Sequence, residues 1–515
     1  MSSVPSTTVP ETEDARLRAD TLADSVLILL VLTIVQRGIG FFRSIVVCRW
    51  LEPEQLGEWD MAFGFLNLAA PLAVLGLPGS FGRYVEHYRQ KGQLKTFLRR
   101  TGICTFIGAV AALAVLLSAN GWFSALVFGS RDFEDLMFVL SLVLATVIAH
   151  NTCTSLFTAL RMYRVVSILQ FINTMSFAAV SLGLLYYWRT DAMSVVAAYG
   201  ISCLITAVLS ALWLSGGWKG IPVNPMIRLP YSAMWAKLLP FAVWVWITNW
   251  LANTFDVADR YMIVHYSGLS APEALMQVGQ YHSSRVVPVL LVGVAELLAN
   301  LLTPHLTQDW EAGHRHEVSH RLNLFLKMFG LGLVGASVAV MFAAPLLFGV
   351  AFEGKFAGGL HVLPWTLTYC CFSATLVMAQ NYLWCAEKAR FASIALAVAL
   401  VVNVTINYLL LPVLGLLGAV LGTAAANAVA LALVFVANRL HGMRVERGTV
   451  LIAALPAVFW LGPWVTLAAT AVVIVAGLVD SRIFSHEDRK RMFEIGNHYV
   501  SRIRSYFRRE HAVQP

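Results

Sequence analysis

Charge is scarce in this chain. Asp, Glu, Lys and Arg make up 13% of its 515 residues, whereas hydrophobic residues make up 58%. Soluble domains carry about 25% charged residues, so the composition excludes a soluble globular protein. The short alternating runs of a membrane β-barrel are also missing. The apolar runs are instead continuous and approach the roughly 20 residues that a helix needs to cross a bilayer. The sequence therefore predicts an all-α polytopic membrane protein.

Catalytic and metal-binding motifs are also missing. None of the seven cysteines belongs to a C-x-x-C pair or lies near a histidine at metal-ligand spacing. The chain contains no GxxxxGK[ST], no HExxH and no G-x-S-x-G. No basic segment with a small-residue cleavage site precedes the first apolar run, so we expect no removable signal peptide. We expect no enzymatic activity, no cofactor, no metal and no ATP-driven pump.

Long apolar segments fill the rest of the chain. We predict about 14 transmembrane helices, the last two uncertain because each is shorter than a full span and the pair could be one re-entrant element. The predicted spans lie near 22–48, 58–79, 101–118, 134–155, 163–187, 192–214, 236–262, 274–303, 322–349, 360–385, 390–411, 416–437, 449–462 and 463–480.

Lys and Arg gather in alternate connections between these spans. Cytoplasmic loops carry the excess of Lys and Arg, so the pattern predicts that both termini lie in the cytoplasm. We expect the protein to reside in the inner (plasma) membrane. The net charge of +8 is largely this asymmetry and does not imply nucleic-acid binding. Two basic segments are amphipathic: the tail 481–515 and the connection that contains Phe81, Tyr84, Val85 and Tyr88. Such helices lie at the membrane surface and bind anionic lipid; a solvated helical face is the alternative.

The chain repeats itself with a period of about 220–230 residues, which is typical of parallel transporter repeats. Asn151 corresponds to Asn381, Asn173 corresponds to Asn403, and Arg43 corresponds to Arg260. Leu56-Gly57 answers Val278-Gly279 in the same way. The predicted organisation is a polar tail (1–20), an N-terminal six-helix lobe (21–215), a linker (216–232), a C-terminal six-helix lobe (233–440), an extra hairpin (441–480) and a basic tail (481–515).

The first span carries charge inside its apolar length. Gln36 and Arg43 project on one face of the helix, and Arg37 lies on the neighbouring strip. Gly38 and Gly40 permit bending or close backbone approach. Neither arginine has an acid near it in its own helix, so both should face water or the interior of the bundle rather than lipid.

The seventh and eighth spans carry a second charged stripe. Its residues are Asn249, Asn253, Asp256 and Arg260 in the seventh span, with Asp259 beside them, and Arg285 and Glu296 in the eighth. An ionised group at the bilayer centre costs about 2.5–3.5 kcal/mol even on a lenient scale. One hypothesis is a hydrated cationic cavity, in which the acids could serve ion coupling. The alternative is internal pairing, for instance Asp256 with Arg260 or Arg285 with Glu296.

Three stretches carry a resemblance to a known family: "GFFRSIVVCRWLEPEQLGEWDMAFGF", "GLPGSFGRYVEHYRQKGQLK" and "FTALRMYRVVSILQFINT". With the six-plus-six plan, they resemble the Wzx-type polysaccharide-transporter flippases of the multidrug/oligosaccharidyl-lipid/polysaccharide exporter superfamily. The resemblance implies a V-shaped bundle with a cationic lumen that moves a polyprenyl-pyrophosphate-linked oligosaccharide to the outer leaflet by alternating access. It also implies the glycosyltransferases or polymerase of a polysaccharide pathway as partners.

The candidate substrate-binding residues of this lumen are Arg37, Arg43, Arg260, Arg285, Gln36, Asn249 and Asn253, and the candidates for ion coupling are Asp256, Asp259 and Glu296. An ion-coupled multidrug antiporter and a peptidoglycan-precursor flippase of the same fold are alternatives. A polyprenyl-dependent glycosyltransferase or polymerase fits less well, because the outer connections are short.

Overall fold

The computed structural model describes residues 22–218, 229–480, 483–484 and 489. The described residues form helices and connecting turns with no β-strand, which confirms the predicted all-α fold. The chain divides into two compact units, residues 1–286 with 348–359 and 407–419, and residues 287–347 with 360–406 and 420–515. This division assigns residues 233–286 to the first unit, whereas the predicted lobe boundary lies at 216–232. The division into two six-helix lobes stays a prediction.

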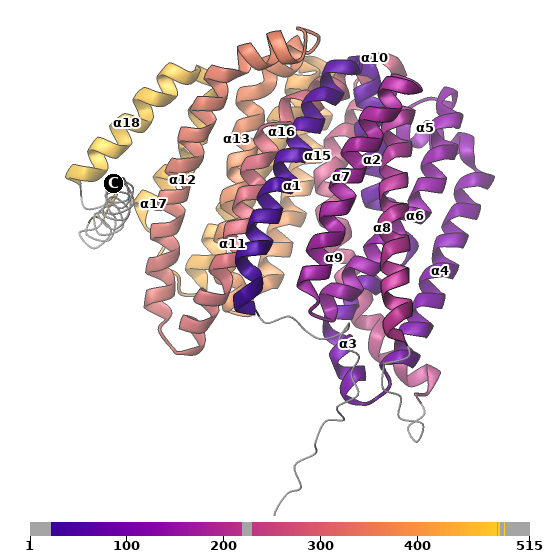
Figure 1. The fold of residues 1–515 in the computed structure, drawn as a ribbon. Coiled ribbons are helices and arrows are strands. Elements are labelled where there is room, and N and C mark those ends of the chain that lie inside the picture. The colour runs from indigo at the N-terminus through magenta and orange to yellow at the C-terminus, as the bar shows by residue number, and fades with distance from the viewer. Residues whose placement is uncertain (1–21, 219–228, 481–482, 485–488, 490–515) are drawn as a thin grey trace, which may run out of the picture. The chain divides into compact units, whose positions relative to one another are not determined.

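The first unit holds the helices labelled α1 to α10 (Figure 1). They are α1 (Leu22–Trp50), α2 (Pro53–Ala73), η2 (Leu77–Ser80), α3 (Phe81–Gln90), α4 (Leu94–Ser118), α5 (Asn120–Phe128), η3 (Arg131–Phe133), α6 (Glu134–Ala159), α7 (Tyr163–Tyr187), α8 (Ala192–Gly217), α9 (Tyr231–Tyr266) and α10 (Ala271–Arg285).

The second unit is built from the later helices, apart from two short segments that join the first unit. The later elements are α11 (Pro288–Glu311), α12 (Arg315–Leu346), η5 (Leu347–Ala351), α13 (Ala357–Ala379), α14 (Asn381–Cys385), α15 (Ala389–Leu414), α16 (Leu416–Leu440), α17 (Arg447–Ala454), η6 (Leu455–Leu461) and α18 (Pro463–Val479).

Nine helices of the described chain are long and apolar enough to cross a membrane, or ten if the pair Pro53–Ala73 and Leu77–Gln90 counts as one bent span. The predicted count of 14 is therefore not confirmed. The fifth predicted span, 163–187, matches α7 (Tyr163–Tyr187). The prediction of one continuous helix over 274–303 is wrong, because the chain breaks between α10 and α11 just before Pro288, which lacks a backbone N–H.

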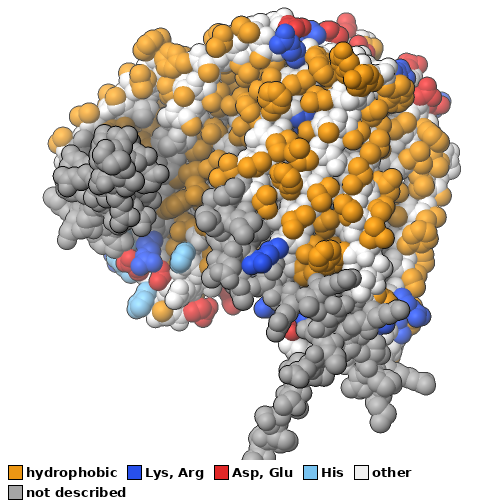
Figure 2. Space-filling view, in the orientation of Figure 1, with side chains coloured by type: hydrophobic (Ala, Val, Ile, Leu, Met, Phe, Trp, Pro, Cys, Tyr) orange, Lys and Arg blue, Asp and Glu red, His pale blue; other side chains and the backbone are white. Residues whose placement is uncertain are grey.

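The outer surface of the first unit agrees with a membrane environment. Side chains of α4 such as Phe106 and Ile107 are 69% and 60% exposed. Over α4 and α8, apolar side chains cover the helices along their length, while charged side chains gather at the helix ends (Figure 2). Exposure of such an apolar surface to water is unfavourable, so these faces are suited to contact with lipid acyl chains.

The amphipathic helix predicted at the second connection exists as α3, but its apolar face does not contact lipid. Phe81, Tyr84, Val85 and Tyr88 are all buried and belong to a core with side chains of α4, α6 and α9. The Tyr88 ring stacks on Phe97 at 4.7 Å between centroids, and the Tyr84 hydroxyl donates to the Lys237 carbonyl at 2.9 Å. The sequence pattern indicated an amphipathic helix correctly but could not identify the surface that covers it. The predicted basic tail 481–515 lies almost wholly outside the described residues.

Two turns in different parts of the chain have the same backbone conformation. The turn between α6 and α7 places Arg161 in the left-handed region (φ 60°), and the turn between α14 and α15 does the same with Glu387 (φ 55°). The hydrogen bonds correspond: Arg161 N–H donates to the Thr158 carbonyl, and Glu387 N–H donates to the Trp384 carbonyl. In the helices that follow, Asn173 contacts Ser202 of α8 and Asn403 contacts Thr423 of α16.

Candidate functional site

The helices α2 and α10 begin in the same way. The side chain of Glu52 caps α2 in a reciprocal pair with Gln55, and Ser270 caps α10 with Glu273. Each helix also has a proline in its first turn, where a missing N–H costs nothing. The two hydrogen bonds from Ser270 lower the pKa of Glu273, so this carboxylate stays ionised at the helix N-terminus, where negative charge is favourable.

These two helices cross through a pair of glycines. A Cβ added to Gly57 would lie 1.9 Å from the Leu275 carbonyl oxygen, and one added to Gly279 would lie 1.7 Å from the Pro53 carbonyl oxygen. Each glycine thus contacts the residue one turn before the other glycine, which makes the crossing locally symmetric. The sequence comparison that pairs Gly57 with Gly279 is consistent with this symmetry. No side chain larger than hydrogen fits here without moving a backbone.

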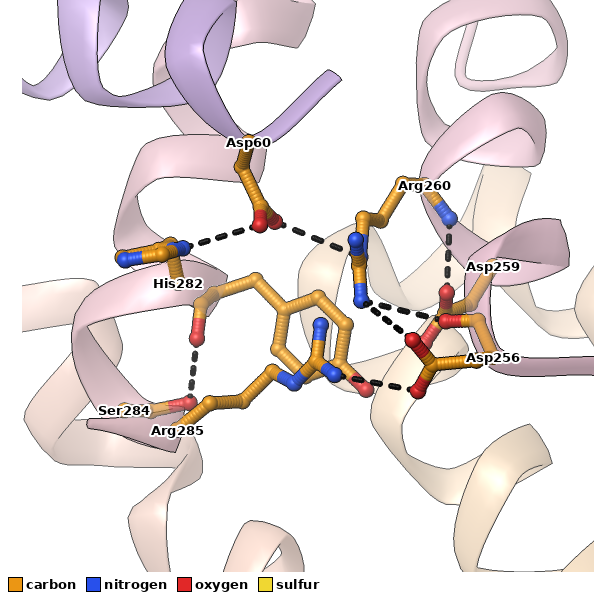
Figure 3. Close-up of polar contacts among 8 residues, drawn as sticks. Asp60, Asp256, Asp259, Arg260, His282, Ser284 and Arg285 are labelled. Atoms are coloured by element: carbon orange, nitrogen blue, oxygen red, sulfur yellow. Dashed lines mark hydrogen bonds and ion pairs between the residues drawn. The ribbon is translucent and has the colours of Figure 1, made fainter. Parts of the chain in front are cut away.

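One turn further along each helix, the equivalent positions hold Asp60 and His282. The His282 Nδ1 lies 2.9 Å from the Asp60 Oδ1, and the Arg260 Nε lies 3.2 Å from the Asp60 Oδ2. Figure 3 shows Asp60 between the two, with Arg260 reaching it from α9. The side chains of Asp60 and Arg260 are only 4% and 3% exposed. A carboxylate on α2 therefore joins α9 and α10 in a dry environment.

The other side of Arg260 faces a second carboxylate. Its Nη2 lies 3.4 Å from the Asp256 Oδ2, and its backbone N–H donates to the Asp259 Oδ1 at 2.8 Å. Asp256 in turn pairs with Arg285 of α10, with 3.2 Å between Nη2 and Oδ1 (Figure 3). Asp256 is 61% exposed, so the network runs from the buried Asp60 to an exposed carboxylate. Tyr281 of α10 also hydrogen-bonds Asp259.

Three carboxylates and two guanidinium groups therefore share one cluster, with His282 beside them. This geometry matches the internal-pairing alternative for Asp256 and Arg260 rather than a lumen of uncompensated cations. The sequence placed Arg285 and Glu296 on one face of a single helix, but the two residues lie on different helices, α10 and α11. Removing one partner of a buried pair leaves a charge without compensation, which is strongly destabilising.

The charged residues of α1 have different surroundings. The guanidinium of Arg43 stacks on the Phe177 ring of α7, 3.9 Å from its centroid, and the side chain is half-buried. No carboxylate of the described chain forms an ion pair with it. Phe177 belongs to an aromatic cluster with Trp59 and Tyr199, at 5.7 and 5.2 Å between centroids. Arg43 is thus a cation held by aromatic rings rather than neutralised by an acid.

The other candidate substrate-binding residues of α1 are Gln36 and Arg37. The amide nitrogen of Gln36 donates to the Ser167 carbonyl of α7 at 3.2 Å, and Arg37 is exposed. A Cβ added to Gly38 or Gly40 would meet nothing within 4 Å. The close backbone approach that the sequence allowed at these two glycines is therefore not present; it occurs at Gly57 and Gly279 instead.

The polar stripe of α9 is only partly engaged. Asn253 donates to the Asn67 carbonyl of α2 at 2.9 Å, while Asn249, one turn earlier, is exposed. Glu296 is exposed on α11. Within the described residues, no group of three or more His, Cys, Asp or Glu side chains could hold a metal ion.

Sequence reasoning missed two members of the network, Asp60 and His282. The signal was available, because the pairing of Gly57 with Gly279 places Asp60 opposite His282 three residues later in each helix. Asp60 was also a carboxylate inside a predicted span, a position that calls for a partner. What the sequence could not supply was the crossing itself, which brings these equivalent positions into contact.

The family model for polysaccharide biosynthesis proteins matches residues 22–310, more than half of the chain. No curated protein matches the chain by sequence.

Among solved structures, the lipid II flippase MurJ in an inward closed conformation is similar over 90% of this chain and 99% of its own, with a TM-score of 0.63 and 12% identity. A multidrug resistance MATE family transporter in an inward-facing conformation covers 78% of this chain and 94% of its own, with a TM-score of 0.58 and 15% identity. A multidrug resistance MATE family transporter in an outward-facing conformation covers 84% of this chain and 98% of its own, with a TM-score of 0.56 and 16% identity. At these identities the likeness shows the fold alone.

Proposed function

Because this chain belongs to the polysaccharide biosynthesis protein family, we propose that it is a flippase for a polyprenyl-pyrophosphate-linked oligosaccharide in polysaccharide export. It is a multi-pass membrane protein with the fold of lipid flippases and multidrug transporters. The proposed movement is from the cytoplasmic to the outer leaflet of the inner membrane, with both termini in the cytoplasm. Glycosyltransferases or a polymerase of the same pathway would supply and consume the lipid-linked glycan.

The observation that carries this proposal is the state of Arg43. The sequence predicts that α1 spans the membrane, and a half-buried guanidinium inside such a helix is costly unless something compensates it. Here aromatic rings hold it and, within the described residues, no carboxylate pairs with it. Such a group can donate to a diphosphate in a bidentate manner, which a neutralised arginine cannot do without losing its partner. Gln36 and the exposed Arg37 and Asn249 would add further polar contacts.

The network of α2, α9 and α10 has a different role in this proposal. Arg260 and Arg285 hold the glycine crossing together through Asp60 and Asp256, and in this proposal the network would close one end of the substrate path. Alternating access requires α2 and α10 to separate, which breaks the contacts of Asp60 with His282 and Arg260. The network contains the carboxylates of Asp60, Asp256 and Asp259. Asp256 is the exposed one, so it is the best placed of the three to exchange an ion during that step.

The experiment replaces Arg43 with Ala or Lys in cells that depend on this protein for surface polysaccharide. We expect Arg43→Ala to reach the membrane in normal amount and to lose surface polysaccharide, while lipid-linked oligosaccharide accumulates on the cytoplasmic leaflet. Arg43→Lys should retain part of the activity because the charge persists without the bidentate fork. Normal surface polysaccharide in the Ala variant would refute the assigned role.

The structural similarity to a lipid II flippase favours one second candidate, transport of a peptidoglycan precursor. Both substrates share the polyprenyl diphosphate and differ in the sugar. Rescue of cells depleted of their own lipid II flippase would support this candidate. A multidrug antiporter would instead export organic cations, which a half-buried unneutralised Arg43 repels. Drug resistance conferred by overexpression would support that function.

A further inference from the structure

A cavity of about 450 Å³ lies in the first unit between the bend that joins α2 to α3 and the turn that joins α6 to α7. One wall consists of Pro78, Gly79 and Gly82, and a Cβ added at Gly82 would meet nothing within 4 Å. The other wall carries polar groups: Thr154, Ser155, Thr158, Arg161 and Tyr163, together with Ala159. Both walls come from connections that the charge pattern predicts to be cytoplasmic.

The lining of this cavity suits an anion. It contains one cation, Arg161, four hydroxyl groups and no carboxylate. The hydroxyl groups of Thr154, Ser155 and Tyr163 have no hydrogen-bond partner among the described residues, whereas Thr158 donates to the Thr154 carbonyl at 2.8 Å. The guanidinium of Arg161 likewise pairs with no described residue. Guanidinium and hydroxyl donors that converge on one space are the groups that bind phosphate oxygens.

The backbone of Arg161 determines how its side chain can be removed in a test. Its φ of 60° is the left-handed conformation that glycine adopts most easily at the end of a helix. The matching turn of the second unit holds Glu387 at φ 55°, so the turn itself demands this conformation. Glycine would be the less strained choice in both turns. Replacing Arg161 with glycine should therefore remove the side chain from the cavity without disturbing the turn.

We propose that this cavity binds the phosphate-bearing headgroup of the lipid-linked substrate on the cytoplasmic side, before the substrate reaches Arg43. The proposal rests on the proposed flippase function. Arg161 supplies the charge, and the hydroxyl groups of Thr154, Ser155 and Tyr163 supply further donors. The open position at Gly82 leaves space for the group. A phosphate could also come from an anionic membrane lipid or from free diphosphate, so the experiment separates these sources.

The test uses two glycine variants of the full-length detergent-solubilised protein. Arg161→Gly removes the guanidinium and eases its backbone, so this variant should fold at least as well as the wild type. Glu387→Gly eases the matching turn and leaves the cavity intact, which makes it the control. The probes are farnesyl diphosphate and inorganic diphosphate, measured by isothermal titration, and phosphatidylglycerol as a competitor in mixed micelles.

We expect both diphosphates to bind the wild type and the Glu387→Gly variant alike, and to bind Arg161→Gly about tenfold or more weakly. We expect phosphatidylglycerol not to displace farnesyl diphosphate at equal concentration. Equal binding to both glycine variants, no binding to the wild type, or ready displacement by phosphatidylglycerol would each overturn the proposal.

The Arg43→Ala variant separates this proposal from the proposed function. If diphosphate binding depends on Arg161 while Arg43→Ala exports polysaccharide normally, the flippase assignment fails and the anion site stands. If Arg43→Ala blocks export while diphosphate binding is unaffected in Arg161→Gly, the cavity proposal alone fails.

Discussion

Arg43 and Arg260 occupy corresponding places in the sequence repeat but have opposite surroundings. Arg260 is 2% exposed and contacts Asp60 and Asp256, with Asp259 on its backbone. Arg43 is half-buried and stacks on Phe177, and no described carboxylate pairs with it. The difference teaches that an arginine inside a helix predicted to span the membrane can be accommodated in two ways. One is neutralisation, which fixes helices to one another; the other is an aromatic support, which leaves the charge available for an anion.

The largest expected effect comes from breaking the neutralised site. Arg260→Ala leaves Asp60 buried with His282 as its only other ion-pair partner in the described chain, and loss of one member of a buried pair costs about 3–5 kcal/mol. We expect a clearly lower midpoint of thermal unfolding in detergent. The double variant Asp60→Asn with Arg260→Gln removes both charges and should recover much of the loss. A wild-type midpoint for Arg260→Ala would contradict a structural role.

A smaller effect is expected at the crossing that the network holds together. Gly57→Ala and Gly279→Ala each place a Cβ within 2 Å of a carbonyl oxygen, and overpacking of this kind costs about 1–3 kcal/mol. Gly40→Ala is the matched control, because its Cβ meets nothing within 4 Å and alanine favours helices. Thermal unfolding of the three variants measures the comparison. If the Gly57 and Gly40 variants shift the midpoint equally, the crossing is not as tight as described.

The smallest effect is expected at the aromatic support of Arg43. Phe177→Leu keeps an apolar side chain of similar bulk and removes the cation–π contact, which is worth about 0.5–2 kcal/mol. We expect a transport rate about two- to fivefold lower with little change in unfolding, because the guanidinium is still present but less well placed. Phe171→Leu, elsewhere on the same helix, serves as the control. An equal loss in both variants would show that Phe177 does not position Arg43.

Much of the fold was predictable because long apolar runs indicate directly that a helix is surrounded by lipid rather than by water. The predicted span 163–187 agrees with α7, and the predicted all-α architecture is confirmed. The predictions fail where tertiary contacts determine what surrounds a helix or where it ends. The α3 face is amphipathic by sequence, yet protein rather than lipid covers it. The break before Pro288 separates α10 from α11 inside one apolar run, which hydropathy averages over.

The site shows the same limit. A sequence can place Asp256 and Arg260 on one helix face, because a spacing of four residues fixes that geometry. It cannot show that Asp60 of α2 completes the pair, since this contact depends on how closely α2 and α10 approach. The glycines that permit the approach were matched in the sequence, but a glycine alone does not say whether its space is filled. Gly40 and Gly57 look alike in sequence and differ completely in packing.

The most direct test of the account is the transport rate per folded molecule in proteoliposomes that contain a polyprenyl-diphosphate-linked oligosaccharide. Arg43→Ala, Arg43→Lys and the wild type would be compared after their thermal unfolding has been measured in the same preparation. We expect Arg43→Ala to unfold at the wild-type temperature and to move almost no substrate, and Arg43→Lys to have an intermediate transport rate. Transport by Arg43→Ala at the wild-type rate would contradict the claim that this arginine receives the diphosphate.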